Sequence, residues 1–181
     1  MIRKLLQRLT DTSDGGKHLP WITRRIMSWL SGFDADKYWH RQFIVANPQA
    51  KVNPLLKAYY LLWIKRVDSK HNCSFGTSFN KGMRAITPPL LPHGPNGIIV
   101  GSDAKIGRGC IIYHQVTIAG GGVIIGDSVE LGAGAKILPN VKIGNHVHVG
   151  ANCVVVEDIP DNATVVLQKP RIINKNNDSK S

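Results

Sequence analysis

The chain has 181 residues, of which 43% are hydrophobic and 19% are charged. These values fit one folded domain with a short appendage and exclude a disordered tail. The longest apolar run, residues 58–64, is bracketed by lysines and is too short to span a membrane, and residues 1–8 lack the apolar core of a signal peptide. The cysteines, Cys73, Cys110 and Cys153, form no CxxC, so we expect neither a disulfide scaffold nor a structural zinc site. A reduced, cytoplasmic protein is expected.

The net charge of +11 is uneven along the chain. Residues 1–75 hold 13 Lys and Arg against 5 Asp and Glu, whereas residues 76–181 hold 10 against 7. A basic chain can bind nucleic acid, but no zinc-finger spacing, RNP-like aromatic motif or basic heptad region is present, so no nucleic-acid partner is expected. The remaining interpretations are a solvated basic face, attraction to a phosphorylated cofactor or an anionic glycan, and peripheral contact with the inner membrane surface.

Up to residue 75 the apolar residues follow helical spacing. The pattern predicts one helix around residues 22–30, a second that Asp34 caps, and a third that begins near Pro54 and ends near Lys70. We therefore divide the chain into an N-terminal helical segment (1–75), a second domain (76–173) and a polar tail (174–181).

From Gly97 onward a repeat of six residues replaces the helical spacing. Ten successive repeat positions are Ile, Leu or Val: Val100, Ile106, Ile112, Ile118, Ile125, Leu131, Ile137, Ile143, Val149 and Val155. Glycine often follows the aliphatic residue, where we expect it to allow a tight or positive-φ corner. The position four residues after the aliphatic residue is small or aliphatic, as at Gly122 and Cys153. A period of six predicts a short strand, a turn and a repeat, with one aliphatic side chain inside each side of a prism. One extra residue within 119–123 predicts a small loop there.

This repeat resembles that of the left-handed parallel β-helix acyltransferases over roughly residues 90–173, and the similarity is greatest to serine acetyltransferase and its capsule-biosynthesis relatives. The matching stretches are 93–100, 104–109, 116–118, 125–126, 131–138 and 149–156, while 33–41 and 87–94 resemble the capsular polysaccharide O-acetyltransferase branch. The resemblance implies a mainly β fold, a left-handed parallel β-helix of hexapeptide repeats with an N-terminal α-helical segment. It also implies acetyl-CoA as donor, a hydroxyl as acceptor, and a homotrimer with active sites between neighbouring prisms. No metal is expected, because the sequence holds no readable constellation of metal ligands around His146 and His148.

Acyl transfer to a hydroxyl needs a base, and histidine suits working pH. His93 stands in a Pro- and Gly-rich turn before Gly97, as the catalytic histidine does in serine acetyltransferase-like enzymes, although the spacing here is four rather than three. His114 follows 21 residues later, about one coil along the chain, and is the second catalytic candidate. A turn or interface histidine without a role is the alternative for each.

Two departures from the serine acetyltransferase pattern shape the predicted function. Residues 73–86 contain no Asp or Glu to partner the histidine, and the loop that helps hold serine is reduced to Gly120–Gly122. We therefore predict transfer of acetyl from acetyl-CoA to a sugar hydroxyl of a capsular, exopolysaccharide or lipopolysaccharide precursor, a glycan or glycolipid acceptor. The alternative is serine O-acetyltransferase of cysteine biosynthesis.

The resemblance also carries over residues that bind the cofactor. Ala133 and Ala151, 18 residues apart, match small positions along the pantetheine arm, and Lys136, Lys169 and Arg171 are candidates for the nucleotide phosphates. The alternative for the alanines is that hexad corners need small residues anyway. The pair His146 and His148 is interpreted as solvent-facing on one strand face. The rival classes are a zinc-using member of the fold and a non-catalytic scaffold.

Overall fold

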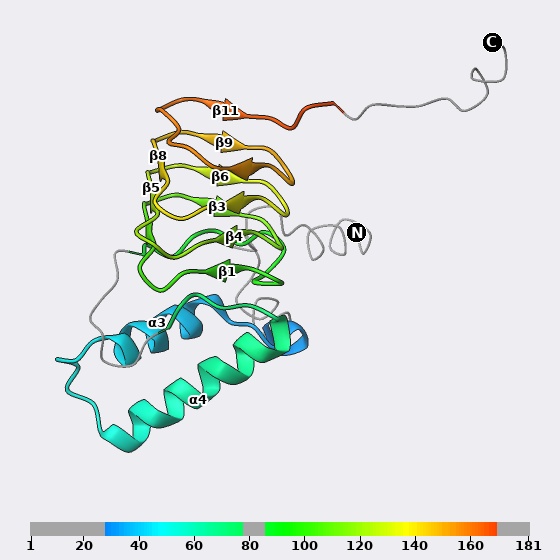
Figure 1. Ribbon diagram of the computed structural model, residues 1–181. Helices are drawn as coiled ribbons and strands as arrows, with labels where there is room; N and C mark the ends of the chain where they lie inside the picture. The colour runs from blue at the N-terminus through cyan, green and yellow to red at the C-terminus, as the bar shows by residue number, and fades with distance from the viewer. Residues whose placement is uncertain (1–27, 78–85, 170–181) are drawn as a thin grey trace, which may run out of the picture.

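The computed structural model describes residues 28–77 and 86–169 (Figure 1). Two helices, α3 (Ala35–Ala46) and α4 (Pro54–His71), lie beneath a column of short strands. The helix expected around residues 22–30 falls largely outside the described residues, and the tail 174–181 and Arg171 fall wholly outside them. No helix within the described ranges is long and apolar enough to cross a membrane.

Both predicted helices are present, and their ends follow from the sequence. The Asp34 side chain accepts a hydrogen bond from the Lys37 amide at 3.0 Å, which confirms it as the N-cap of α3. In α4, Pro54 occupies the first turn, where its missing N–H costs nothing, and Asn53 accepts from the Leu55 amide at 2.8 Å. Asn72 ends α4 in the left-handed region with φ 48°.

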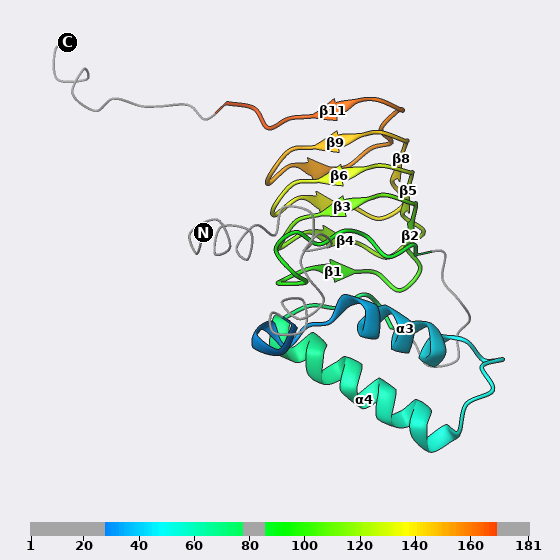
Figure 2. The ribbon, with the colours of Figure 1, turned by 180° about the vertical axis from the view of Figure 1, so that it is seen from behind.

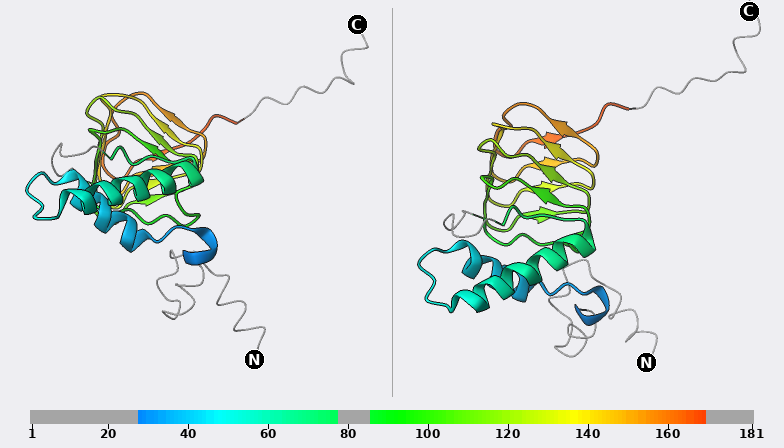
Figure 3. Two further views of the ribbon diagram at one scale, coloured as in Figure 1. Left: turned by 90° about the horizontal axis from the view of Figure 1, so that it is seen from below. Right: turned by 60° about the horizontal axis from the view of Figure 1, so that its bottom comes forward.

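Aromatic packing joins the helices to the base of the column. Tyr38 and Trp39 of α3 meet the Phe75 ring edge-on at centroid distances of 5.7 and 4.9 Å. The Tyr38 hydroxyl donates to a carboxylate oxygen of Asp68 on α4 at 2.7 Å, and burial raises the pKa of Asp68. Seen from below, α4 lies across the end of the column (Figure 3). The helices therefore close one end of the β domain.

The column is a parallel β-helix of about four turns. Its strands are β1 (Ile99–Val100), β2 (Lys105–Ile106), β3 (Ile111–Ile112), β4 (Thr117–Ile118), β5 (Ile124–Ile125), β6 (Glu130–Leu131), β7 (Lys136–Ile137), β8 (Lys142–Ile143), β9 (His148–Val149), β10 (Val154–Val155) and β11 (Thr164–Val165). They form three parallel sheets with the orders β1-β4-β7-β10, β2-β5-β8 and β11-β9-β6-β3. Because almost every strand pairs with the strand three places later, three strands make one coil, and the sheets are the sides of a prism (Figure 2).

Described residues that precede β1 also pair with the first regular strands. Isolated bridges join Ser74 to Ile99, Ile86 to Ile106 and Leu90 to Ile111, one on each side of the prism. At the other end, Ile159 bridges to β8 and completes the last coil on that side.

The predicted core of the prism is confirmed. All ten aliphatic repeat positions are at most 2% exposed, and burial of each such side chain contributes about 1.5–3 kcal/mol. Cys110 and Cys153 are also buried in the inward small-residue positions. One position was wrong: Gly122 is exposed, and Val123 points inward instead. The extra residue of the 119–123 loop lies before the inward position, so the repeat resumes one residue later.

The glycines that follow the aliphatic residues do not have the positive φ expected of them. They are required because successive coils approach closely: a Cβ on Gly126 would lie 2.6 Å from the Gly144 carbonyl oxygen, and one on Gly132 would lie 2.6 Å from the Ala151 nitrogen. Positive φ belongs to the second turn residue instead, three positions after the aliphatic residue, as at Ser128 (56°) and Asn152 (57°).

Candidate active site

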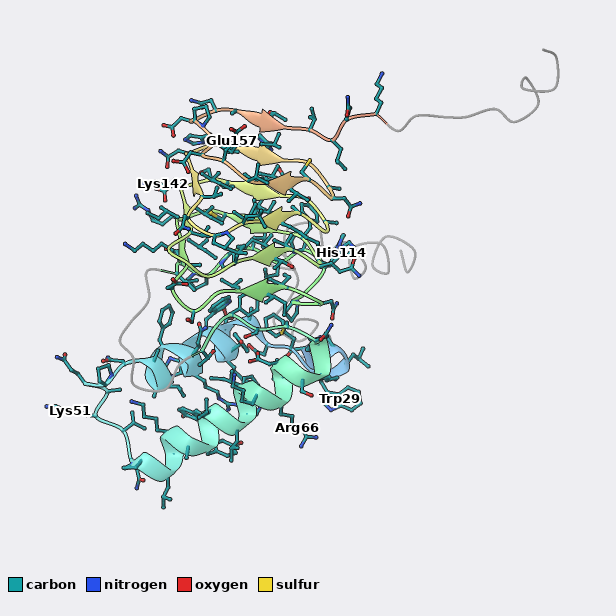
Figure 4. The ribbon with its side chains drawn as sticks, viewed as in Figure 1. Trp29, Lys51, Arg66, His114, Lys142 and Glu157 are labelled. Carbon is teal, nitrogen blue, oxygen red and sulfur yellow. The ribbon has the colours of Figure 1, made fainter. Side chains whose placement is uncertain are left out.

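One edge of the prism brings together most of the predicted site residues. We call it the histidine corner, and it comprises the turns 113–116, 132–135 and 150–153 that lead from the β3-β6-β9-β11 sheet to the β1-β4-β7-β10 sheet. His114, Ala133 and Ala151 occupy the first turn position on successive coils. The coils are joined there by bonds from Gly134 N to the His114 carbonyl at 3.0 Å and from Asn152 N to the Ala133 carbonyl at 2.8 Å. Figure 4 shows His114 at the edge of the prism opposite Lys142.

The two candidate histidines, about one coil apart along the chain, are in contact. His93 lies in the turn before β1, and its Nδ1 is 2.9 Å from Nδ1 of His114. The ring centroids are 5.0 Å apart, and Tyr113 meets the His93 ring edge-on at 5.4 Å. His93 is exposed and His114 is half-buried. The pair therefore has one solvent-facing ring and one ring partly covered by protein.

Asn96 fixes the loop that carries His93, a role that the sequence analysis missed. Its Nδ2 donates to the His93 carbonyl at 2.9 Å, and its own carbonyl accepts from the Gln115 amide at 2.9 Å. Its Oδ1 lies 2.9 Å from Nδ1 of His71 at the end of α4. The sequence signal for this role was an Asn between Pro95 and Gly97, close to the candidate base. No sequence signal pointed to its partner His71, which lies 25 residues away along the chain.

The hydrogen bonds determine which ring nitrogen of His71 carries hydrogen. The His93 carbonyl can only accept, so Nδ2 of Asn96 faces it and Oδ1 of Asn96 faces His71. Nδ1 of His71 is therefore the donor, and its Nε2 is buried without a partner among the described residues. The end of α4, the 93–97 loop and the base thus form one connected unit.

No carboxylate contacts this histidine pair within the part of the chain that the structure describes. Among the described residues the two rings bond to each other, while the His93 carbonyl accepts from Nδ2 of Asn96 and the His114 carbonyl accepts from the Gly134 amide. The side-chain partner that the described residues give the His93 ring is therefore His114.

The alanines of the histidine corner leave backbone donors open. No described residue accepts a hydrogen bond from the N–H of Ala133 or Ala151. Lys136, on β7 just past the corner, is exposed, and its Nζ lies 3.4 Å from the Gly134 carbonyl. Lys169 is exposed four residues after β11. An acceptor along this edge could therefore meet open N–H groups and a nearby lysine.

His146 and His148 are both exposed, as predicted, but they do not share a strand face. His146 is a turn residue with φ 56°, whereas His148 lies on β9 with its Nδ1 3.1 Å from Glu130 of the neighbouring coil. No group of three or more His, Cys, Asp or Glu is placed to hold a metal ion in residues 28–77 and 86–169.

The shortened loop Gly120–Gly122 lies on a different edge from the histidine corner. One carboxylate oxygen of Asp103 accepts from both the Gly121 and the Gly122 amides at 2.9 Å. Positive φ at Gly121 and Gly122 lets the loop close around that side chain.

Comparisons with known proteins agree with the repeat and the fold. The family described as Bacterial transferase hexapeptide (six repeats) matches residues 122–156. The serine acetyltransferase of Mycobacterium tuberculosis is 43% identical over 77 residues, which cover 39% of this chain and 34% of that protein. The serine acetyltransferase of Helicobacter pylori is 35% identical over 107 residues, 55% of this chain and 62% of that protein. The chain thus spans between about a third and two thirds of the curated relatives it matches.

A solved structure has a similar fold over most of this chain. The serine acetyltransferase of Neisseria gonorrhoeae, in complex with serine, has a TM-score of 0.59 at 26% identity and covers 93% of this chain and 69% of that one. Over residues 122–156 the repeats of this chain are similar to those of bacterial hexapeptide-repeat transferases, and the relatives from M. tuberculosis and H. pylori are serine acetyltransferases.

The predicted sugar acceptor is wrong. Relatives and structural neighbours are serine acetyltransferases, which fit the alternative of cysteine biosynthesis, and nothing in the comparisons supports the capsular branch, a glycan partner or membrane contact. The prediction relied on the shortened 120–122 loop and on the absence of Asp and Glu from residues 73–86. A missing loop removes one set of contacts but does not identify the acceptor that replaces them.

Proposed function

We propose that this protein is an acetyl-CoA-dependent O-acetyltransferase whose acceptor is the hydroxyl of serine. The observation that carries this proposal is the contact between His93 and His114, 2.9 Å from Nδ1 to Nδ1, at the head of a column of open backbone N–H groups. A base beside a row of unused donors is what acyl transfer from a thioester requires. The homologues named serine acetyltransferase supply the acceptor.

In the proposed reaction His93 takes the proton of the serine hydroxyl while that oxygen attacks the thioester carbonyl carbon. The C–S bond of the tetrahedral intermediate then breaks, and the CoA thiolate leaves. The protonated histidine returns the proton to that sulfur, so the products are O-acetylserine and CoA. The enzyme ends in its starting protonation state, and no acyl-enzyme forms.

Acetyl-CoA would lie along the histidine corner. The open N–H groups of Ala133 and Ala151 suit carbonyl oxygens of the pantetheine arm, and their methyl side chains allow a ligand to approach the backbone. Lys136 and Lys169 are exposed and can meet the nucleotide phosphates. Arg171, outside the described residues, stays a prediction.

We further propose a homotrimer in the cytoplasm, with each site between neighbouring prisms. The β1-β4-β7-β10 side and the corner after it carry exposed apolar side chains: Ile99 (41%), Leu138 (40%), Val154 (53%) and Val156 (65%). A partner prism would cover them. The buried free thiols of Cys73, Cys110 and Cys153 suit a reducing compartment.

The test is thiol release from acetyl-CoA with L-serine as acceptor. We expect turnover by the wild type and a loss of about 10²–10⁴-fold in His93→Ala, with acetyl-CoA binding retained. His146→Asn is the matched control: it alters an exposed histidine on another edge, and its φ of 56° suits Asn. Full activity in His93→Ala, or no turnover of serine by the wild type, would contradict the proposal.

A further inference from the structure

We infer that His114 is the positioning residue of His93: a neutral imidazole that takes the place of a carboxylate and holds the base in its active tautomer. The inference rests on the proposed function, because it assigns His93 as the base. It begins from the contact of 2.9 Å between the two Nδ1 atoms, on the edge of the prism where Figure 4 labels His114.

A hydrogen bond between two neutral imidazoles fixes their proton count. Each neutral ring carries one N–H, and the bond needs one donor and one acceptor at the two Nδ1 atoms. If His93 donates from Nδ1, its Nε2 is bare and the Nε2 of His114 carries hydrogen. If His114 donates, the assignment is reversed. The pair therefore always presents one bare Nε2, the base, and one Nε2–H.

The difference in exposure between the rings decides which nitrogen is bare. When the pair takes up a proton it becomes a cation, and burial disfavours a charged ring. His93 is exposed, whereas His114 is half-buried between coils. The charge is accordingly better placed on His93, so His93 donates from Nδ1 and receives the substrate proton at Nε2.

The surroundings of the pair are consistent with this assignment. Tyr113 meets the His93 ring edge-on at 5.4 Å, and His71 reaches the same loop through Asn96. These are the other titratable groups that the described residues bring to the pair. His71 donates to Asn96 and, through it, fixes the His93 backbone rather than its ring. The Nδ1 acceptor that orients the His93 ring is therefore His114.

The consequence is a base partnered by a neutral group. In serine proteases a buried carboxylate both holds the histidine tautomer and stabilises the imidazolium that forms. A neutral imidazole holds the tautomer equally well but adds no charge. Replacement of His114 by a carboxylate should therefore favour the protonated base without disturbing its geometry.

Three substitutions of His114 separate its role as a hydrogen-bond acceptor from the effect of charge. Oδ1 of Asn or Asp is as many bonds from Cα as Nδ1 of His, so either residue can place an acceptor near the His93 ring. His114→Leu removes the acceptor and should lower kcat with serine by about 10²-fold or more, with the KM for acetyl-CoA unchanged. His114→Asn restores an acceptor and should recover most of that loss. His114→Asp should move the acidic limb of the kcat/KM profile to higher pH. Equal activity of the Leu and Asn variants, at equal thermal stability, would overturn the assignment.

The tautomers can be measured without turnover. Long-range ¹H–¹⁵N correlation spectra of protein labelled at histidine, assigned with His93→Gln and His114→Asn, should show hydrogen on Nδ1 of His93 and on Nε2 of His114. A bare Nδ1 on His93 would overturn the inference. If the expected tautomers are found but serine gives no product, the positioning assignment stands and the proposed function fails.

Discussion

Two edges of the same prism are built from the same repeat but have different chemistry. At the edge between the β2-β5-β8 sheet and the β3-β6-β9-β11 sheet, which we call the Asx corner, the first turn residues of successive coils include Asp127, Asn145 and Asp161. Each side chain accepts the backbone N–H of the coil before it: Arg108 N to Asp127 at 2.7 Å, Asp127 N to Asn145 at 2.8 Å and Asn145 N to Asp161 at 2.8 Å. These bonds form a ladder along the edge.

At the histidine corner the same positions hold His114, Ala133 and Ala151. Methyl groups stand where the Asx corner has acceptors, so the backbone N–H groups of Ala133 and Ala151 remain open in the described structure. Polar backbone groups that a protein leaves unpaired cost stability unless water or a ligand pairs them. Side chains thus add bonds between the coils at the Asx corner, whereas the histidine corner keeps two backbone donors available for the cofactor that we propose there.

The largest effect should come from disconnecting the base from α4. Asn96→Ala removes the bonds to the His93 carbonyl and to His71, and a shift of the base by about 1 Å can cost about 10²-fold. We expect a loss of this order in kcat with serine. The measurement is steady-state kinetics with Asn145→Ala as control, since that variant loses comparable hydrogen bonds at the Asx corner. A loss shared by both variants would mean that the hydrogen bonds of the Asn96 side chain serve stability alone.

An Asx side chain introduced at the histidine corner should weaken cofactor binding. Ala151→Asn places an acceptor where Asn145 stands at the other edge, so its side chain would take the N–H of Ala133. We expect the KM for acetyl-CoA to rise about tenfold, the equivalent of about 1.4 kcal/mol, with the melting temperature unchanged or raised. Ala151→Asp should bind still more weakly, because the carboxylate repels the nucleotide phosphates. An unchanged KM in both variants would remove Ala133 from the cofactor site.

The converse change should affect stability and not activity. Asn145→Ala removes the acceptor for the Asp127 amide and the amide contacts to Asp161. We expect the free energy of unfolding to fall by about 1 kcal/mol, measured by urea denaturation, with kinetics on serine unchanged. A fall in activity without a fall in stability would show that the two edges are not separate in function.

The sequence predicted those parts of the molecule that depend on local periodicity. The spacing of six placed all ten aliphatic repeat positions from Val100 to Val155 inside the prism, and the Asp34 cap and Pro54 marked where two helices begin. It also placed Ala133 and Ala151 one coil apart, and therefore on one edge.

The sequence did not predict features that depend on tertiary contacts. Helical spacing found α4 but not its buried side, since Leu55 is 81% and Leu62 is 70% exposed while Ile64 is buried. The link from His71 to Asn96 joins residues 25 apart and leaves no periodic signal. The acceptor was predicted wrongly because it was inferred from a missing loop and a missing acidic residue, and a repeat that encodes the scaffold does not encode what the scaffold binds.

The smallest effect should be a dependence of stability on pH that arises at the Asx corner. The backbone N–H of Arg108 holds the pKa of Asp127 below its usual range, and that of Asn145 does the same for the pKa of Asp161. Because the folded pKa values are lowered, the charged carboxylates stabilise the fold above the unfolded pKa of about 3.9, and this contribution is lost as pH falls through the lowered values.

Asp127→Asn keeps an acceptor for the Arg108 amide but cannot titrate. The melting temperature of Asp127→Asn should therefore fall less steeply than that of the wild type below about pH 4. Glu157→Gln, which removes an exposed carboxylate without such a bond among the described residues, should follow the wild-type curve. Identical curves for Asp127→Asn and the wild type would mean that the ladder bonds hold as well with a protonated carboxyl, and that the Asx corner owes its stability to geometry rather than to charge.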